Sequence, residues 1–243
     1  MTFAVCPLPR ESLPRAFYDR PTLDVTADLI GKVLVHQTRA GVAAGMIVEA
    51  EAYIGEDDPA CHAAPGPTKR NEPLYGPPGV AYVYLNYGMH YLVNAVTEAK
   101  GAPAAVLIRA LAPLDGIPLM LKRRLGQSQV ALRPDGTALT DGSPKANRPG
   151  ARGRANRKPI REAELCRGPG NLTKALGISL AENRLDLTSS RLWIEDRGLN
   201  AGRLNWGTRI GINVGTERPW RCWASDHECV SGRRVSRRGS RPG

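Results

Sequence analysis

The sequence contains no hydrophobic run near the roughly 18 residues that a membrane-spanning helix needs. Its first 20 residues carry three prolines and scattered charges where a secretory signal would place an apolar segment. Cysteine is scarce and odd in number, with five thiols spread over a chain long enough to bury a core without disulfides. These absences predict a soluble cytoplasmic protein with reduced cysteines.

Patterns typical of bound cofactors and metals are also missing. The chain has no P-loop and no dinucleotide-binding glycine pattern. Near the C-terminus, Cys222, His227 and Cys229 offer at most three local ligands, in no recognised zinc spacing. Cys61 and His62 are adjacent, and neighbouring residues on a strand or turn point apart, so they do not predict a nucleophile with its base. The sequence therefore predicts neither a metal nor a cofactor.

Positive charge, in contrast, is abundant and unevenly placed. The chain has 34 basic and 23 acidic residues, for a net charge of +11. Residues 121–161 hold a local charge of +9 and residues 231–243 one of +5, which leaves −3 for the rest. We expect a flexible basic insertion at 126–160 and a basic tail at 232–243 that bind a polyanion, usually nucleic acid. The alternative is two solubilising segments without a partner.

Strand patterns outnumber helix patterns and show no regular βαβ alternation. This predicts one α+β domain over 1–243, with a mostly antiparallel sheet. The expected folded core comprises 20–125 and 163–231. Helices are expected at 22–31, 115–125 and around 165–176. Strands are expected at 33–36, 44–54, 80–85, 90–97, 104–111, 192–195, 208–214 and 220–224.

One predicted strand alternates strictly in polarity over 48–54. On a strand, Glu49, Glu51 and Tyr53 point to one side and the apolar residues between them point to the other. Two carboxylates beside a tyrosine could form a general acid/base site. By itself, however, the pattern favours a strand that shows its carboxylates to solvent.

Tyrosines are concentrated in one short segment. Five of the seven tyrosines lie between residues 75 and 91, whereas the whole chain has two phenylalanines. Tyr82 and Tyr84 share one face of a predicted strand, and Tyr87 lies beside Gly88 at the expected tip of a hairpin. Aromatic rings gain about 1–3 kcal/mol when they stack on a nucleic-acid base. We expect Tyr87 to enter a base stack, and Tyr82 and Tyr91 to pack in the core.

Several motifs occur in an order that resembles one known family. They are GMIVEAEAYIGEDDPACHA, RN, GPPGVAYVYLNYGMHYLVNAVT and AVLIRALAPLDG, followed by ELCRGPGNLTKALGI, LWIEDRG, TRIGI and RPWRCW. Over about 20–125 and 163–231, the chain resembles the alkyladenine (3-methyladenine) DNA glycosylases, also known as the mammalian-type methylpurine DNA glycosylases. The resemblance implies a curved sheet with flanking helices and a hairpin that inserts into DNA.

The function implied by this resemblance is DNA repair. A monofunctional, monomeric glycosylase of this type flips damaged purines such as 3-methyladenine out of duplex DNA. It excises them by hydrolysis and so starts base excision repair, near the nucleoid if the cell is bacterial. Two alternatives from other classes remain: a nucleic-acid-binding protein that has lost catalysis, and an enzyme of free nucleosides, which would need neither the hairpin aromatic nor the basic segments.

The resemblance also implies a catalytic set. Glu51 would be the general base that activates water, which separates it from Glu49. Arg109 would hold that water together with Glu51, and the main-chain carbonyl of Ile210 would be the third partner. These roles come from the resemblance and not from the alternation of the strand.

The remaining site residues implied by the resemblance contact the base or the duplex. Tyr53, His62 and Tyr84 would surround the flipped base. Asn94 would crowd the exocyclic position of guanine and so disfavour normal purines. Tyr87 would fill the gap left in the duplex.

The chain departs from the family pattern outside these positions. The Arg-rich insertion is longer than usual, and Asn171 stands where the family commonly has a lysine after GPG. Glu228 and Cys229 replace a proline–aromatic pair, and residues 72–75 differ from the typical sequence. None of these departures falls on a residue of the implied catalytic set.

Overall fold

The computed structural model describes residues 11–126, 131–132, 138–139 and 159–232. The predicted basic insertion and basic tail therefore lie almost entirely outside the described residues. The helices are α1 (Arg15–Tyr18), α2 (Thr22–Leu29), α3 (Ile117–Leu125) and α4 (Pro169–Leu176), with 3-10 turns η1 (Glu72–Tyr75), η2 (Glu162–Glu164) and η3 (Leu180–Glu182). The strands are β1 (Val33–Thr38), β2 (Gly41–Ile54), β3 (Ala81–Asn86), β4 (His90–Val96), β5 (Ala104–Asp115), β6 (Ala131–Leu132), β7 (Ala138–Leu139), β8 (Leu192–Glu195), β9 (Leu204–Gly207) and β10 (Arg221–Ala224).

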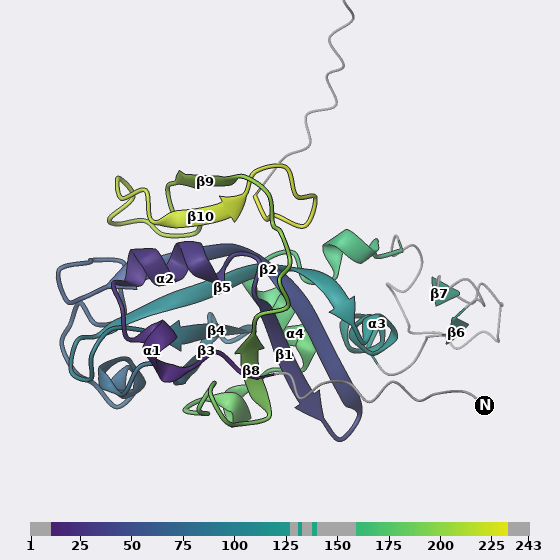
Figure 1. Cartoon of the computed structure of the whole chain (residues 1–243), viewed down its shortest axis with the longest axis horizontal. Helices are drawn as coiled ribbons and strands as arrows, with labels where there is room; N and C mark the ends of the chain where they lie inside the picture. Colours follow the sequence, from purple (N-terminus) through teal and green to yellow (C-terminus); the bar gives the residue numbers. More distant parts are fainter. Residues whose placement is uncertain (1–10, 127–130, 133–137, 140–158, 233–243) are drawn as a thin grey trace, which may run out of the picture.

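The fold is built on one antiparallel sheet of eight strands. Its main order is β3-β4-β5-β2-β1-β8, and β10 joins it by pairing with β2 and with β9 (Figure 1). The short β6 and β7 form a separate pair. Helices lie around a curled antiparallel sheet, so the expected α+β class is confirmed.

Strand β2 changes its neighbour part-way along its length. On one edge it pairs with β5 over 44–54, and on the other it pairs with β1 over 41–46 and with β10 over 49–51. The register with β5 shifts on both sides of Glu49. Bulges of this kind bend a strand and occur often beside active sites. The two acidic residues of β2 therefore lie where the sheet turns from β1 to β10.

Helix α4 packs against β4 and β5 because its sequence carries both end signals and an apolar stripe. Pro169 occupies the first turn, and Gly177 follows the last residue with a φ of 75°, the usual proline-start and glycine-stop arrangement. Leu172, Ala175 and Leu176 are fully buried in the main core. In the part of the chain that the structure describes, no helix is long and apolar enough to cross a membrane.

Most predicted elements are present, but the strand predicted at 208–214 is wrong. The strand of this region is β9, which ends at Gly207, and residues 208–214 form no strand. Gly211 has a φ of 81°, which interrupts an extended chain. At Ile210 the main-chain N–H donates to the carboxylate of Glu51. The main chain of Ile210 therefore hydrogen-bonds to side chains of the sheet, Glu51 and Arg109, and not to a neighbouring strand.

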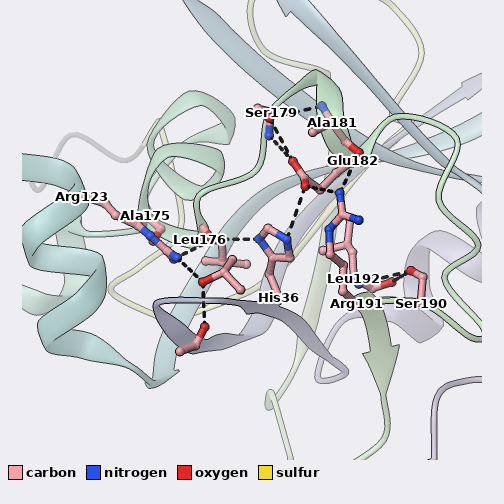
Figure 2. Close-up of polar contacts among 12 residues, drawn as sticks. His36, Arg123, Ala175, Leu176, Ser179, Ala181, Glu182, Ser190, Arg191 and Leu192 are labelled. Atoms are coloured by element: carbon pink, nitrogen blue, oxygen red, sulfur yellow. Dashed lines mark hydrogen bonds and ion pairs between the residues drawn. The ribbon is translucent and has the colours of Figure 1, made fainter.

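A buried polar cluster joins β1 to the turn η3 and the start of β8. The carbonyl of Leu176 lies 3.0 Å from Nδ1 of His36. Because a carbonyl only accepts, Nδ1 is the donor. The other ring nitrogen faces the carboxylate of Glu182 at 3.6 Å (Figure 2). Glu182 in turn accepts hydrogen bonds from Arg191 and from Ser179. Burial lowers the pKa of His36, so the folded protein favours the neutral imidazole.

This lowered pKa predicts a stability that depends on pH. On acidification the unfolded chain takes up a proton at residue 36 before the folded chain does, so stability falls as pH drops through the ordinary histidine pKa. In the variant His36→Gln that contribution is absent. Thermal unfolding at pH 7.5 and pH 5.5 should therefore show a smaller loss for the variant than for the wild type. His90→Gln, at an exposed position, is the control and should keep the wild-type loss. An equal loss in all three proteins would contradict the prediction.

Candidate active site

Strand β2 is buried on both of its faces over residues 49–52. Glu49 and Glu51 are each 0% exposed, and Ala50 and Ala52 on the opposite face are also fully buried. The expectation of a solvent-facing row of carboxylates is therefore wrong. The reason is tertiary, because segments from the C-terminal quarter of the chain donate hydrogen bonds to both carboxylates.

Glu51 is held by three donors from three different segments. Its Oε1 accepts the main-chain N–H of Ile210 at 2.7 Å. Its Oε2 accepts the hydroxyl of Tyr53 at 3.0 Å and Nη1 of Arg109 at 3.1 Å. A carboxylate oxygen can accept two hydrogen bonds, so Oε1 is also able to accept one from a water molecule.

Arg109, on β5, lies between the two carboxylates. Its Nε donates to Glu49 at 3.0 Å, and its Nη1 donates both to Glu51 and, at 3.3 Å, to the carbonyl of Ile210. Its Nη2 contacts the hydroxyl of Ser231 at 3.3 Å. The structure thus brings Glu51, Arg109 and the main chain of Ile210 within hydrogen-bond distance of one another.

Glu49 supports this arrangement from behind. Its carboxylate accepts hydrogen bonds from Arg109, from Nε of Arg221 at 2.8 Å and from both the N–H and the hydroxyl of Ser231. The alternation on β2 placed Glu49 and Glu51 on one face but could not distinguish them. Their partners do, because Tyr53 and Ile210 line a cavity, whereas Arg221 and Ser231 do not.

Burial controls the protonation of Glu51. Desolvation raises its pKa above the usual carboxyl value, although Arg109, the N–H of Ile210 and the hydroxyl of Tyr53 each act to lower it. A carboxylate with a raised pKa is a stronger base than one in water, and a general base works best when its pKa lies near the operating pH.

A cavity of about 380 Å³ opens beside this group, a size typical of small-molecule sites. The aromatic rings of its wall come from β2, β3 and the loop after β2. All the residues that were expected to contact a base line this cavity: Tyr53, His62, Tyr84, Asn94 and Ile210. Tyr82 lines it as well.

Histidine 62 is fixed among the tyrosines as a neutral ring. Its Nδ1 lies 2.8 Å from the hydroxyl of Tyr82, and its ring packs edge-on against Tyr84 at 4.4 Å between centroids. Burial, and to a smaller degree Arg70, lowers the pKa of His62 to about 4. At neutral pH the imidazole therefore adds no positive charge to the cavity.

Two neighbouring residues show what the sequence interpretation missed. Tyr82 is buried, as expected for a core residue, but it also lines the cavity and holds His62. Cys61 lines the cavity as well, and burial raises the pKa of its thiol to about 11, so it stays protonated. Strand alternation indicated the face of Tyr82, but only the fold shows that a cavity opens on that face.

Asn94 and Tyr87 both line the cavity, Asn94 from β4 and Tyr87 from the turn after β3. The amide of Asn94 is 4% exposed and donates to the carbonyl of Tyr82 at 2.9 Å, which fixes its orientation. Tyr87 is 80% exposed and lies in the turn between β3 and β4. Tyr87 and Gly88 have φ values of 48° and 68°, so a non-glycine residue occupies a left-handed position at the hairpin tip. Such strain costs about 1–3 kcal/mol and is found mostly at functional sites.

The sequence profile of the methylpurine-DNA glycosylases matches residues 16–228. The chain belongs to this family. A relative from Methanocella arvoryzae is 43% identical over 225 residues, which cover 91% of this chain and 96% of the relative. A second, from Rubrobacter xylanophilus, is 44% identical over 216 residues, which cover 88% and 95%. Both carry the provisional name 3-methyladenine DNA glycosylase.

Membership of the methylpurine-DNA glycosylase family makes the chain an enzyme that acts on DNA. It is a hydrolase of N-glycosyl bonds with a function in DNA repair. The matched range, 16–228, includes all the residues that line the cavity.

The contacts of Glu49 predict a large effect on stability. Glu49→Gln would remove the charge that the buried Arg109 and the partly buried Arg221 share, and breaking a buried ion pair from one side typically costs about 3–5 kcal/mol. The free energy of unfolding, measured by urea titration, should fall by that order. The control is Glu72→Gln, whose exposed carboxylate pairs with Arg184 at the surface and should change stability little. Equal effects of the two substitutions would show that the buried network adds no stability.

Proposed function

We propose that this glycosylase flips a damaged purine out of duplex DNA into the aromatic cavity and cleaves its N-glycosidic bond with water. The observation that carries the proposal is the buried carboxylate of Glu51, which accepts hydrogen bonds from three residues that line the cavity, Ile210, Tyr53 and Arg109. A binding protein would gain little from a desolvated carboxylate beside a phosphate backbone.

The aromatic wall favours a cationic base. Alkylation at a ring nitrogen gives the purine a positive charge, and a desolvated aromatic ring attracts a cation by about 2 kcal/mol or more. Tyr53 and Tyr84 offer such rings, and the neutral His62 adds no repulsion. The same positive charge weakens the glycosidic bond, so the lesion that binds well is also the one that leaves easily.

Water attack completes the reaction. Glu51 takes a proton from a water positioned with the help of Arg109 and the carbonyl of Ile210. As the water oxygen bonds to the sugar carbon, the bond to the base breaks and its electron pair leaves with the purine. The products are a free base and an abasic site, with the proton on Glu51. These steps use only side chains and main-chain groups and need no metal or cofactor.

Asn94 supplies selectivity in this proposal. Because its Nδ2 donates to the carbonyl of Tyr82, the side chain keeps a fixed orientation in the cavity. A rigid amide next to the base would collide with the exocyclic amino group of guanine. Normal guanine is then disfavoured although it has the same size as many lesions.

Tyr87 would stabilise the flipped state from the minor groove. Extruding a nucleotide leaves a hole in the stack, and unstacking costs a few kcal/mol. An exposed ring on a tight hairpin has the shape to fill that hole, as apolar wedges do in other DNA-binding proteins. In this proposal the enzyme acts as a monomer, and the basic segments at 126–160 and 232–243 add contacts to phosphates.

The role of Glu51 is tested by the variant Glu51→Gln. General-base catalysis contributes about 10²–10⁴-fold, so release of 3-methyladenine from methylated duplex DNA should fall by that order under single-turnover conditions, while binding of lesion DNA persists. The wild-type rate should also decline as pH falls through the raised pKa of Glu51, and the variant should lack this acid limb. Glu182→Gln alters a buried carboxylate outside the cavity and should keep the rate. Full activity of Glu51→Gln would exclude Glu51 as the base.

The wedge role is tested by Tyr87→Ser. This variant should cleave a lesion in a paired duplex more slowly than the wild type, and the defect should shrink when the lesion is mispaired, because flipping is then easier. Tyr84→Ser should slow cleavage in both contexts alike, since it removes part of the cavity wall. The measurement is single-turnover cleavage of one lesion in the two contexts. A wild-type rate for Tyr87→Ser on paired DNA would make Tyr87 a surface residue without this role.

A further inference from the structure

Two buried charges outside the proposed chemistry lie directly behind the cavity wall. The side chains of Arg209 and Asp58 are both 0% exposed, and neither lines the cavity. Nη1 and Nη2 of Arg209 donate to the two carboxylate oxygens of Asp58 at 2.5 and 2.7 Å. A bidentate pair of this kind fixes orientation as well as charge. The pair also contacts residues of the cavity wall and of the segment that carries Glu51.

Arg209 connects the segment after β9 to β2. Its Nη1 also donates to the carbonyl of Ala52 at 3.1 Å, between Glu51 and Tyr53 in the sequence. Its guanidinium lies 4.7 Å from the centroid of the Tyr53 ring, whose side chain lines the cavity. The next residue, Ile210, is the one that donates its N–H to Glu51.

Asp58 connects the same arginine to the loop after β2. Its carboxylate accepts the N–H of Ala60 at 3.2 Å, and its carbonyl accepts the N–H of Cys61 at 2.8 Å. Ala60, Cys61 and His62 all line the cavity. One buried ion pair therefore links the loop that carries His62 to the segment that carries Ile210.

We propose that the Asp58–Arg209 pair is a positioning element of the active site, which holds the main chain of Ile210 against Glu51 and the ring of Tyr53 against the cavity. Residues 208–214 form no strand, so side-chain contacts of Arg209 replace the ladder that would otherwise fix this segment. The inference rests on the proposed role of Glu51 as the base. Arg209 and Asp58 act through their neighbours and do not touch the substrate.

A positioning role has a signature that a purely structural role lacks. The N–H of Ile210 is one of the groups that hold down the pKa of Glu51 against the effect of burial. If the main chain at Ile210 moves away, the pKa of Glu51 rises further. The acid limb of the pH–rate profile must then move to higher pH.

The test is Arg209→Lys, which keeps the positive charge but loses the bidentate geometry. A misplacement near 1 Å can cost about 100-fold in rate, so we expect single-turnover excision of 3-methyladenine to slow by about 10- to 100-fold. Binding of lesion-containing duplex should be largely unchanged, and the acid limb should move to higher pH. Because the charge is retained, such a shift reports geometry.

The matched control is Arg197→Lys. Arg197 bridges Glu195 at 2.6 Å and Asp115 at 2.8 Å, away from the cavity, and its variant should keep the wild-type acid limb and rate. If Arg209→Lys does not fold, Asp58→Asn takes its place, because it breaks the bidentate pair but keeps the charge of Arg209. An unpaired Arg209 would by its charge lower the pKa of Glu51, so a move of the acid limb to higher pH in this variant still reports geometry.

Two outcomes would overturn the inference. The first is a folded variant with the wild-type rate and acid limb, and the second is a slower enzyme whose acid limb has not moved, because the pair would then only support the fold. Failure of the underlying proposal is recognised separately, since the wild type would itself lack an acid limb or Glu51→Gln would remain fully active.

Discussion

Burying the carboxylate of Glu51 away from solvent is the constraint on which the rest of this structure depends. A lone buried carboxylate is strongly disfavoured and would simply take up a proton. The protein surrounds it instead with donors and alternating charges. Three buried carboxylates, those of Glu49, Glu51 and Asp58, form one network with three arginines whose side chains are buried or nearly buried. These are Arg109, Arg209 and Arg221. Formal charge is balanced within it, and Arg109, the N–H of Ile210 and the hydroxyl of Tyr53 each act against the rise in the pKa of Glu51 that burial causes.

The bend of β2 follows from the same requirement. A straight strand paired with β1 along its whole edge would leave no room for donors from the C-terminal part of the chain. The bulges around Glu49 turn the strand, and β10 takes over the pairing at 49–51. This change brings Arg221 and Ser231 to Glu49. The irregularity of the sheet is thus part of the site and not a defect of it.

How much of this could be predicted from sequence depends on how local each cause is. Strand alternation predicted that Glu49, Glu51 and Tyr53 share a face, because it depends only on neighbouring residues. It could not predict that the face is buried, since the covering groups lie more than 150 residues away. The strand predicted at 208–214 failed for the same reason. Its polar main chain bonds to side chains of the sheet, and no pattern within 208–214 shows that.

The resemblance to a family identified residues that line the cavity but not the residues that hold them in place. Tyr53, His62 and Ile210 were expected from motif matches, whereas no role was implied for Asp58 or Arg209, although both lie within the matched motifs. Their role becomes visible only through burial and through the loops that they join.

In the proposed mechanism, selection for damaged bases follows from the balance of charge around the cavity. Because the carboxylates and arginines of this network pair with one another, the attraction that the cavity would offer a cationic lesion comes from aromatic faces. A ring face senses charge that is spread over a flat heterocycle, and this is how alkylation distributes it. A neutral His62, with its pKa near 4, leaves that attraction intact at physiological pH. In the proposed mechanism, one property of the lesion, its delocalised positive charge, thus determines both how tightly the base is held and how readily its bond breaks.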